Sequence, residues 1–140
     1  MKKNKGYTLI ELLVTIAVIG ILSAIAIPAY LGQQSRAART EAFKHLETLR
    51  LLEEQAYSEF ADYTASAAGV AAIIGELPGF QPGTGLNFTY TITQNLEITA
   101  TNPLAYGAAT PCFTAVATGI ATSRVAGEVF AIDCNNNKNF

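Results

Sequence analysis

The first 35 residues of this chain restrict its fold more than any other part, because they form a long apolar segment with one acid near its start. Three lysines come first, at positions 2, 3 and 5, and no charged side chain occurs from Leu12 to Ser35. The segment Tyr7–Ile27 has about the 20 residues that an α-helix needs to cross roughly 30 Å of hydrocarbon. The sequence therefore predicts a helix able to span a membrane.

Charge around this segment predicts its orientation and marks one residue as functional. Lys2, Lys3 and Lys5 favour a cytoplasmic N-terminus, with everything after Pro28 on the far side of the membrane. The exception within the apolar run is Glu11. An acid at the bilayer centre costs about 2.5–3.5 kcal/mol on insertion scales, so it is a functional candidate that requires a partner.

Two simpler interpretations of the same residues stay open. A secretory signal peptide would be cleaved near Ser23–Ala26, although its apolar region normally has roughly 7–15 residues and lacks an acid such as Glu11. A permanent membrane anchor needs no processing at all. Sequence physics alone does not place a cleavage site.

The run Lys5-Gly6-Tyr7-Thr8-Leu9-Ile10-Glu11-Leu12, with Ile27-Pro28-Ala29-Tyr30 closing the apolar helix, resembles the start of a type IV pilin. The resemblance implies that a prepilin peptidase cleaves between Gly6 and Tyr7 and methylates the new amine of Tyr7. Most members of that family have phenylalanine where this chain has tyrosine. Residues 1–6 would then be a cleaved leader.

The resemblance also implies a partner for Glu11. In pilins this carboxylate is thought to meet the N-terminal amine of a neighbouring subunit as helices bundle into a filament core. A pairing within one subunit is the alternative, since positions four apart share a helix face. A tolerated acid without a role is the third interpretation.

The helix is predicted to continue beyond the apolar run. Charged residues from Arg36 to Glu59 alternate with apolar ones at spacings of three, four and seven, namely Ala42, Leu46, Leu49, Ala56 and Phe60. This pattern is typical of an amphipathic helix to about Tyr63. We therefore expect a membrane or filament-core helix over 7–28, an amphipathic helix over 29–63 and a connecting loop over 64–86.

Pro28 lies inside the predicted helix, where a proline removes a backbone donor and clashes with the preceding turn. It is interpreted either as a boundary between the membrane and external helices or as a kink that bends during assembly.

An antiparallel sheet with a disulfide is predicted over 87–140. Alternating residues predict strands at Phe88–Thr93 and Leu96–Thr101, joined as a hairpin through Gln94-Asn95-Leu96 with Asn95 at positive φ. A second pair is predicted at about Cys112–Ile120 and Gly127–Cys134. Placing Cys112 opposite Cys134 aligns Val116 with Phe130, and an oxidising exterior favours a disulfide between the two cysteines. Similar bridges close the C-terminal region of pilins.

The expected fold is α+β, the pilin fold: one long N-terminal helix packed on a four-stranded antiparallel sheet. Loss of the three leader lysines changes 9 basic and 11 acidic residues to 6 and 11, a side-chain charge of −5. This acidic charge predicts no basic surface for binding nucleic acid, although DNA uptake is possible in the family.

No catalytic set is predicted, because the chain has one histidine, His45, and two cysteines expected to be bridged. The same residues make a poor zinc site, and Asp133 with the following asparagines is a weak start for calcium. We therefore expect no enzyme activity, no cofactor and no metal.

The resemblance implies a structural subunit that waits in the inner membrane and polymerises with identical subunits into a cell-surface filament for adhesion, twitching motility or DNA uptake. Its partners would be the prepilin peptidase, an assembly platform, a motor ATPase and minor pilins. Alternatives are a minor pilin, a type II secretion pseudopilin or a monomeric membrane-anchored binding module. An electron-conducting filament is a remote alternative that would use Tyr7, Tyr30, Phe43, Tyr57, Phe60 and Tyr63.

Overall fold

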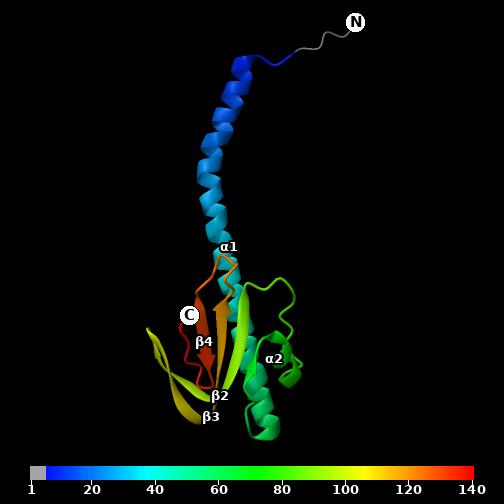
Figure 1. Ribbon diagram of the computed structural model, residues 1–140, viewed down its shortest axis with the longest axis vertical. Coiled ribbons are helices and arrows are strands. Elements are labelled where there is room, and N and C mark those ends of the chain that lie inside the picture. Colours follow the sequence, from blue (N-terminus) through cyan, green and yellow to red (C-terminus); the bar gives the residue numbers. More distant parts are fainter. Residues whose placement is uncertain (1–5) are drawn as a thin grey trace. The chain divides into compact units, whose positions relative to one another are not determined.

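The computed structural model describes residues 6–140 and divides the chain into two compact units. The first unit ends at Arg36, and the second spans Ala37–Phe140. Helix α1, Leu9–Phe60, begins in the first unit and ends in the second (Figure 1). The predicted orientation depends on Lys2, Lys3 and Lys5, which lie outside the described residues.

In the first unit, α1 has apolar side chains on all sides and none of its residues is buried. By length and composition, α1 can cross a membrane, and signal sequences have the same features. Pro28 lies within this helix, and the residues on both sides of it are helical.

In the second unit, one stripe of α1 packs against the sheet, as the 3.6-residue period predicts. The buried residues of this stripe are Ala38, Ala42, Leu46, Leu49, Glu53 and Ala56. The prediction was wrong for Phe60, which is 77% exposed at the last position of the helix. Instead, Glu53 occupies a buried position seven residues after Leu46.

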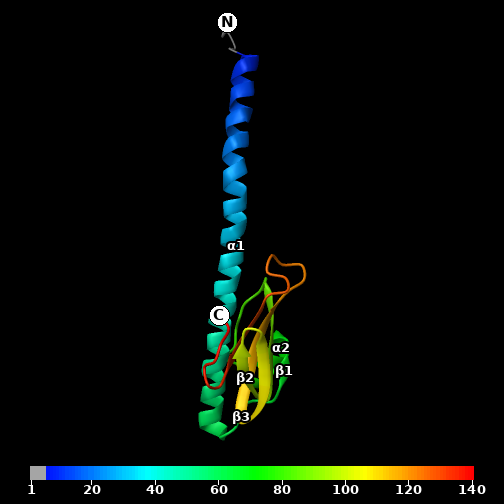
Figure 2. The ribbon, with the colours of Figure 1, turned by 90° about the vertical axis from the view of Figure 1, so that its left-hand side faces the viewer.

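The sheet has four antiparallel strands in the order β1-β2-β3-β4. These are β1 Ala67–Ala68, β2 Phe88–Thr101, β3 Leu104–Gly119 and β4 Val129–Asp133. The second-unit part of α1 runs along one face of this sheet (Figure 2). The predicted α+β class, a long helix on a four-stranded antiparallel sheet, is confirmed.

The predicted connecting loop contains regular structure. Residues 64–86 include strand β1 and the short helix α2, Val70–Glu76. β1 forms the edge of the sheet beside Thr91 and Ile92 of β2, and Ile73 of α2 is fully buried in the core. The Ala-rich sequence concealed both elements because alanine has no strong β preference and α2 is only seven residues long.

The predicted hairpin between Phe88–Thr93 and Leu96–Thr101 was wrong. β2 is one continuous strand whose partner is β3, and the chain reverses at Asn102-Pro103, between the paired residues Thr101 and Leu104. Asn95 does have a positive φ of 60°, but it lies at a register irregularity rather than in a turn. Opposite it, β3 bulges at Ala109–Cys112, where Pro111 has no N–H to donate to a ladder.

The predicted register of the second strand pair was wrong by one residue. Val116 lies opposite Ala131, and Ala117 lies opposite Phe130. The prediction used the cysteine pair as a cross-strand alignment, but β4 ends at Asp133, so Cys134 already lies beyond the strand. The observed register places Ala115 and Ala117 in the core beneath α1, because a one-residue slip exchanges the two faces of a strand.

The core of the second unit joins the α1 stripe to the inner face of the sheet and contains several groups of aromatic rings. Phe43 packs against Phe130 and Phe140, with ring centroids 4.8 and 4.5 Å apart. Tyr63 lies between Tyr57 and Phe113, at 4.7 and 4.9 Å. These rings pack the interface between helix and sheet.

Candidate functional site

Helix α1 begins with a reciprocal pair of hydrogen bonds between Thr8 and Glu11. The Glu11 backbone N–H donates to Thr8 Oγ1 at 3.2 Å, and the Thr8 backbone N–H donates to Glu11 Oε2 at 2.9 Å. The Thr8 hydroxyl also donates to Oε2 at 2.8 Å. This is a capping box, in which the first orphan N–H groups of a helix gain side-chain acceptors. It explains why the helix starts at Leu9 rather than at Tyr7.

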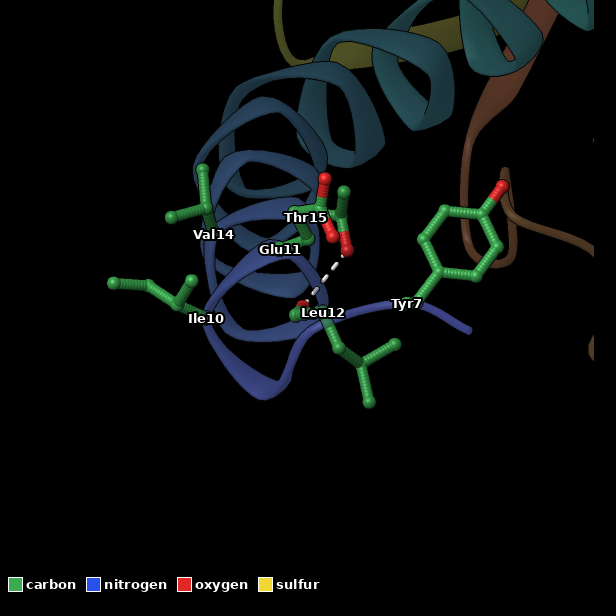
Figure 3. Close-up of a pocket in the computed structure, with 6 residues that line it drawn as sticks. All are labelled: Tyr7, Ile10, Glu11, Leu12, Val14 and Thr15. Atoms are coloured by element: carbon green, nitrogen blue, oxygen red, sulfur yellow. Dashed lines mark hydrogen bonds between the residues drawn. The ribbon is translucent and has the colours of Figure 1, made fainter. Parts of the chain in front are cut away.

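The side chains around Glu11 form an open apolar surface (Figure 3). Tyr7 and Ile10 are 91% and 70% exposed, and Leu12 and Val14 are also largely exposed. Thr15 turns its hydroxyl back onto the helix and donates to the Leu12 carbonyl at 2.8 Å. Glu11 therefore brings a carboxylate to a surface that is otherwise mostly apolar and that water would hydrate poorly.

Two properties of this segment bear on its chemistry. The Gly6–Tyr7 peptide bond is exposed and precedes the helix, and no heavy atom approaches the position of a Cβ at Gly6. The Glu11 carboxylate keeps acceptor capacity after its bonds to Thr8, because an ionised carboxylate has about four acceptor sites. The segment can therefore present a peptide bond for cleavage and a carboxylate for pairing with a cation.

The sequence contains a signal for the Thr8–Glu11 pair that hydropathy and charge do not reveal. Threonine followed three residues later by glutamate, just before an apolar run, is the signature of a capping box. Glu11 therefore has a local structural role within one chain in addition to any role between chains.

Glu53 is a buried carboxyl group that periodicity placed among the charged residues. It accepts a hydrogen bond from the Thr64 N–H at 3.0 Å and another from the Thr64 hydroxyl, so it ties α1 to the chain leaving that helix. Burial raises the pKa of Glu53, and the hydrogen bonds from Thr64 oppose that shift. No local sequence signal distinguishes it from the exposed acids around it.

The C-terminal segment is fastened by a disulfide and by one buried carboxylate. Cys112 and Cys134 form a disulfide, the pairing that the sequence predicts. The fully buried Asp133 accepts hydrogen bonds from the backbone N–H groups of Ile98, Asn135 and Asn137, at 2.8–2.9 Å. Its oxygens therefore hold the turn after β4 in place. This is the carboxylate that the sequence presented as a weak candidate for a calcium site.

His45 is half-buried beside the sheet, with Nδ1 2.8 Å from the Tyr90 hydroxyl. Burial lowers the pKa of His45 and raises that of Tyr90, so both are held in their neutral forms at neutral pH. This pair joins helix to sheet. It is distant in sequence from Glu11 and belongs to the other compact unit.

Comparison with known proteins points to the same segment. Residues 1–27 match the family described as "Prokaryotic N-terminal methylation motif". The chain is 35% identical over 91 residues to the "Type IV major pilin protein PilA" of Myxococcus xanthus, covering 65% of this chain and 38% of that protein. It is 43% identical over 67 residues to a "Fimbrial protein" of Pseudomonas aeruginosa, covering 48% and 44%. A "Fimbrial protein" of Moraxella nonliquefaciens is 45% identical over 80 residues, covering 54% and 52%.

The chain spans about half or less of the length of these relatives. No solved structure matches it. The relatives are named as pilins and fimbrial proteins, which are structural proteins and not enzymes. The methylation motif, these relatives and the helix-on-sheet fold together support a type IV pilin.

Proposed function

We propose that the chain is a structural subunit of a type IV pilus. It would be held in the inner membrane by the first half of α1 and would then polymerise with identical subunits into a cell-surface filament. The observation that carries this proposal is the apolar surface of the first unit, which is exposed on all sides and interrupted by one acid, Glu11. Lipid before assembly and neighbouring helices afterwards would cover it.

Processing is the first step of the proposal. A prepilin peptidase would cleave the exposed bond after Gly6 and methylate Tyr7. The sheared extracellular fraction should then contain this chain in abundance, beginning at Tyr7 and heavier by one methyl group. Mass spectrometry of that fraction is the test. Recovery of the chain only from membranes, with Met1 intact, would contradict the proposal and favour a monomeric anchored module.

Glu11 would supply the contact that drives assembly. The α-amino group freed at Tyr7 is largely positive at neutral pH, and the Glu11 carboxylate of a neighbour would pair with it as the helices bundle. A carboxylate that costs free energy in lipid would thereby gain a partner in the filament.

A matched pair of variants separates this role from the capping box. Glu11→Gln retains an oxygen that can serve at the third position of a capping box, whereas Glu11→Ala does not. We expect both variants to stay in the membrane and both to lose most of their filaments, measured as chain in the sheared fraction. A wild-type filament yield from Glu11→Gln would show that the cap alone matters and would contradict the charge pairing.

For the assembly machinery and for the uses of the filament, the proposal goes no further than what type IV pilins have in common. An assembly platform, a motor ATPase and minor pilins would act on this subunit. Adhesion, twitching motility and DNA uptake are the candidate uses of the filament. An abundant chain in the sheared fraction would favour a major pilin over a minor pilin or a pseudopilin.

A further inference from the structure

An open cleft lies at the C-terminal end of α1, where this helix meets the segment that follows α2. Its volume is about 360 Å³. Leu52, Ala56, Phe60 and Leu77 give it apolar walls, and Glu59 and Glu76 supply two exposed carboxylates. None of the basic side chains in residues 6–140 lines it. The cleft therefore favours a ligand that combines a positive charge with a short apolar stem.

The carboxylates of this cleft have no cationic partner within the described part of the chain. Salt bridges elsewhere in that part join Arg39 to Glu128 and Lys138 to Glu47. Glu59 accepts one hydrogen bond, from Gln55 Nε2 at 3.1 Å, and Glu76 accepts none. Two acids beside exposed apolar surface, including the 77% exposed Phe60, form an incomplete binding surface.

The loop between β3 and β4 presents the complementary charge. Arg124 is exposed at its centre and forms no hydrogen bond or ion pair in residues 6–140. The loop is nevertheless held in place, because Gly119 N–H donates to the Glu128 carbonyl at 2.8 Å and Val125 is buried. The exposed neighbours of Arg124 in this loop have small side chains, namely Ala121, Thr122 and Ala126. They leave room for a second surface to approach.

Cleft and loop lie at opposite ends of the second unit. Both views place the loop, coloured orange, at one end and the C-terminal turns of α1, coloured green, at the other (Figures 1 and 2). Arg39, which pairs with Glu128 at the base of the loop, precedes Glu59 on the same helix. Their separation of 20 positions corresponds to about 30 Å at the rise of an α-helix. Arg124 therefore does not reach the cleft of its own chain.

We propose that Arg124 of one copy docks into the cleft beside Glu59 and Glu76 of a second copy. This proposal rests on the pilus function above and names a contact between second units. Complementary surfaces at opposite ends of the second unit make a head-to-tail contact, which extends into an open filament rather than a closed dimer. The guanidinium would bind the carboxylates through charge-assisted hydrogen bonds, and its stem would cover Phe60 and Leu77.

Charge reversal tests the contact in the assembled filament. We expect Arg124→Glu and Glu76→Arg each to lower the sheared filament yield at least tenfold. The double variant, which restores opposite charges across the contact, should recover at least threefold over either single variant. Lys44→Glu is the matched control, because it makes the same change in charge at an exposed residue of α1 far from the loop in sequence; its yield should remain within twofold of wild type.

Any of three results would overturn the contact. The single variants could give yields within twofold of wild type, the double variant could show no recovery, or Lys44→Glu could lose as much yield as they do. None of these results affects the pilus function, which the wild-type filament establishes independently. A wild-type chain that forms no filaments would overturn both proposals.

A covalent probe locates the contact directly. Arg124→Lys keeps the positive charge and adds an amine that a carbodiimide can join to a carboxylate as an amide. In filaments grown from a mixture of unlabelled and ¹⁵N-labelled chains, we expect mixed-isotope peptides that join position 124 to Glu59 or Glu76. Filaments that form normally but yield no such peptide would overturn the proposed contact.

Discussion

At the scale of single residues, Glu53 shows how a buried charge makes stability depend on pH. Burial holds the pKa of this carboxyl above its ordinary value of 4.5. The folded chain therefore binds a proton that the unfolded chain has already released at the same pH. Stability then falls as pH rises above about 4.5 through the raised pKa.

Glu53→Gln tests this linkage, because glutamine has no charge and keeps one oxygen that can accept from the Thr64 N–H, while its NH2 group can donate to the Thr64 hydroxyl oxygen. We expect the free energy of unfolding of the wild type minus that of the variant to be larger at pH 4 than at pH 7. Urea unfolding followed by circular dichroism, on the full chain in detergent, measures it. A wild-type advantage that increases with pH would contradict the raised pKa.

Glu53→Ala serves as the comparison for the hydrogen bonds alone. It removes the acceptor and leaves the Thr64 N–H to find another partner. Relative to glutamine, alanine should lower the free energy of unfolding by about 1–3 kcal/mol at both pH values. Equal stability of the two variants would mean that Thr64 contributes nothing through this acid.

Gly119 is a second residue with a testable role, because the backbone of the following loop comes so close to it that a side chain would not fit. It is the last residue of β3, and a Cβ there would lie 1.9 Å from the carbonyl oxygen of Val125. Backbone cannot yield as a flexible side chain can, so Gly119→Ala should displace the loop that bears Arg124. We expect a loss of about 1–3 kcal/mol in the free energy of unfolding.

Gly75→Ala is the matched control for that substitution. Gly75 lies inside α2, its φ is not positive, and a Cβ there meets no atom within 4 Å. Alanine is favoured over glycine in a helix, so this variant should gain about 0.5–1 kcal/mol. The same denaturation measurement applies to both variants, and equal effects would contradict the steric explanation at Gly119.

At the scale of elements, the disulfide closes the segment that contains the end of β3, the Arg124 loop and β4. Cys112 and Cys134 are 22 positions apart. Closing a loop of this size stabilises the folded state by about 3 kcal/mol on chain-entropy grounds. The double variant Cys112→Ser/Cys134→Ser should therefore have a clearly lower thermal midpoint than the wild type. Reduced wild-type chain is the control and should melt near the variant; equal midpoints for oxidised and reduced chain would contradict this estimate.

The elements also show where local patterns fail. The period of α1 predicted the buried positions Ala42, Leu46, Leu49 and Ala56 because a helix repeats the same geometry at each turn. Strand pairing was harder to predict. Alternation identified residues 88–93 and 96–101 as extended, but it did not show that they form one strand whose partner is β3. The Asn102-Pro103 turn signal was present between them and the next strand.

At the scale of the whole molecule, the core belongs to one of the two compact units. Among residues 6–140, every residue of the hydrophobic core lies between Ala38 and Phe140, within the second unit. A chain that begins at Ala37 keeps this core, the sheet and the disulfide, and it loses the exposed apolar residues of the first unit.

We therefore expect the fragment 37–140 to fold without detergent and to remain a monomer. Size-exclusion chromatography, circular dichroism and a cooperative thermal transition are the measurements. The wild-type chain purified in parallel should require detergent. A fragment that aggregates or lacks a cooperative transition would show that the first unit contributes to folding.

The apolar helix, its lone acid, the pilin resemblance and the amphipathic stripe were all accessible from the order of the residues. Such features depend on composition and on spacings of a few positions, which a local pattern records. The capping role of Glu11 was equally local, since Thr8 lies three residues before it.

Other features depend on contacts between segments far apart in the chain. The burial of Glu53 against Thr64, the β2–β3 pairing, the one-residue register of β4 and the turn built on Asp133 belong to this group. Each is a choice among alternatives with nearly equal local propensity, and the packing of the whole core resolves it. Hence a prediction from spacing alone found the long apolar helix but not the register of the sheet.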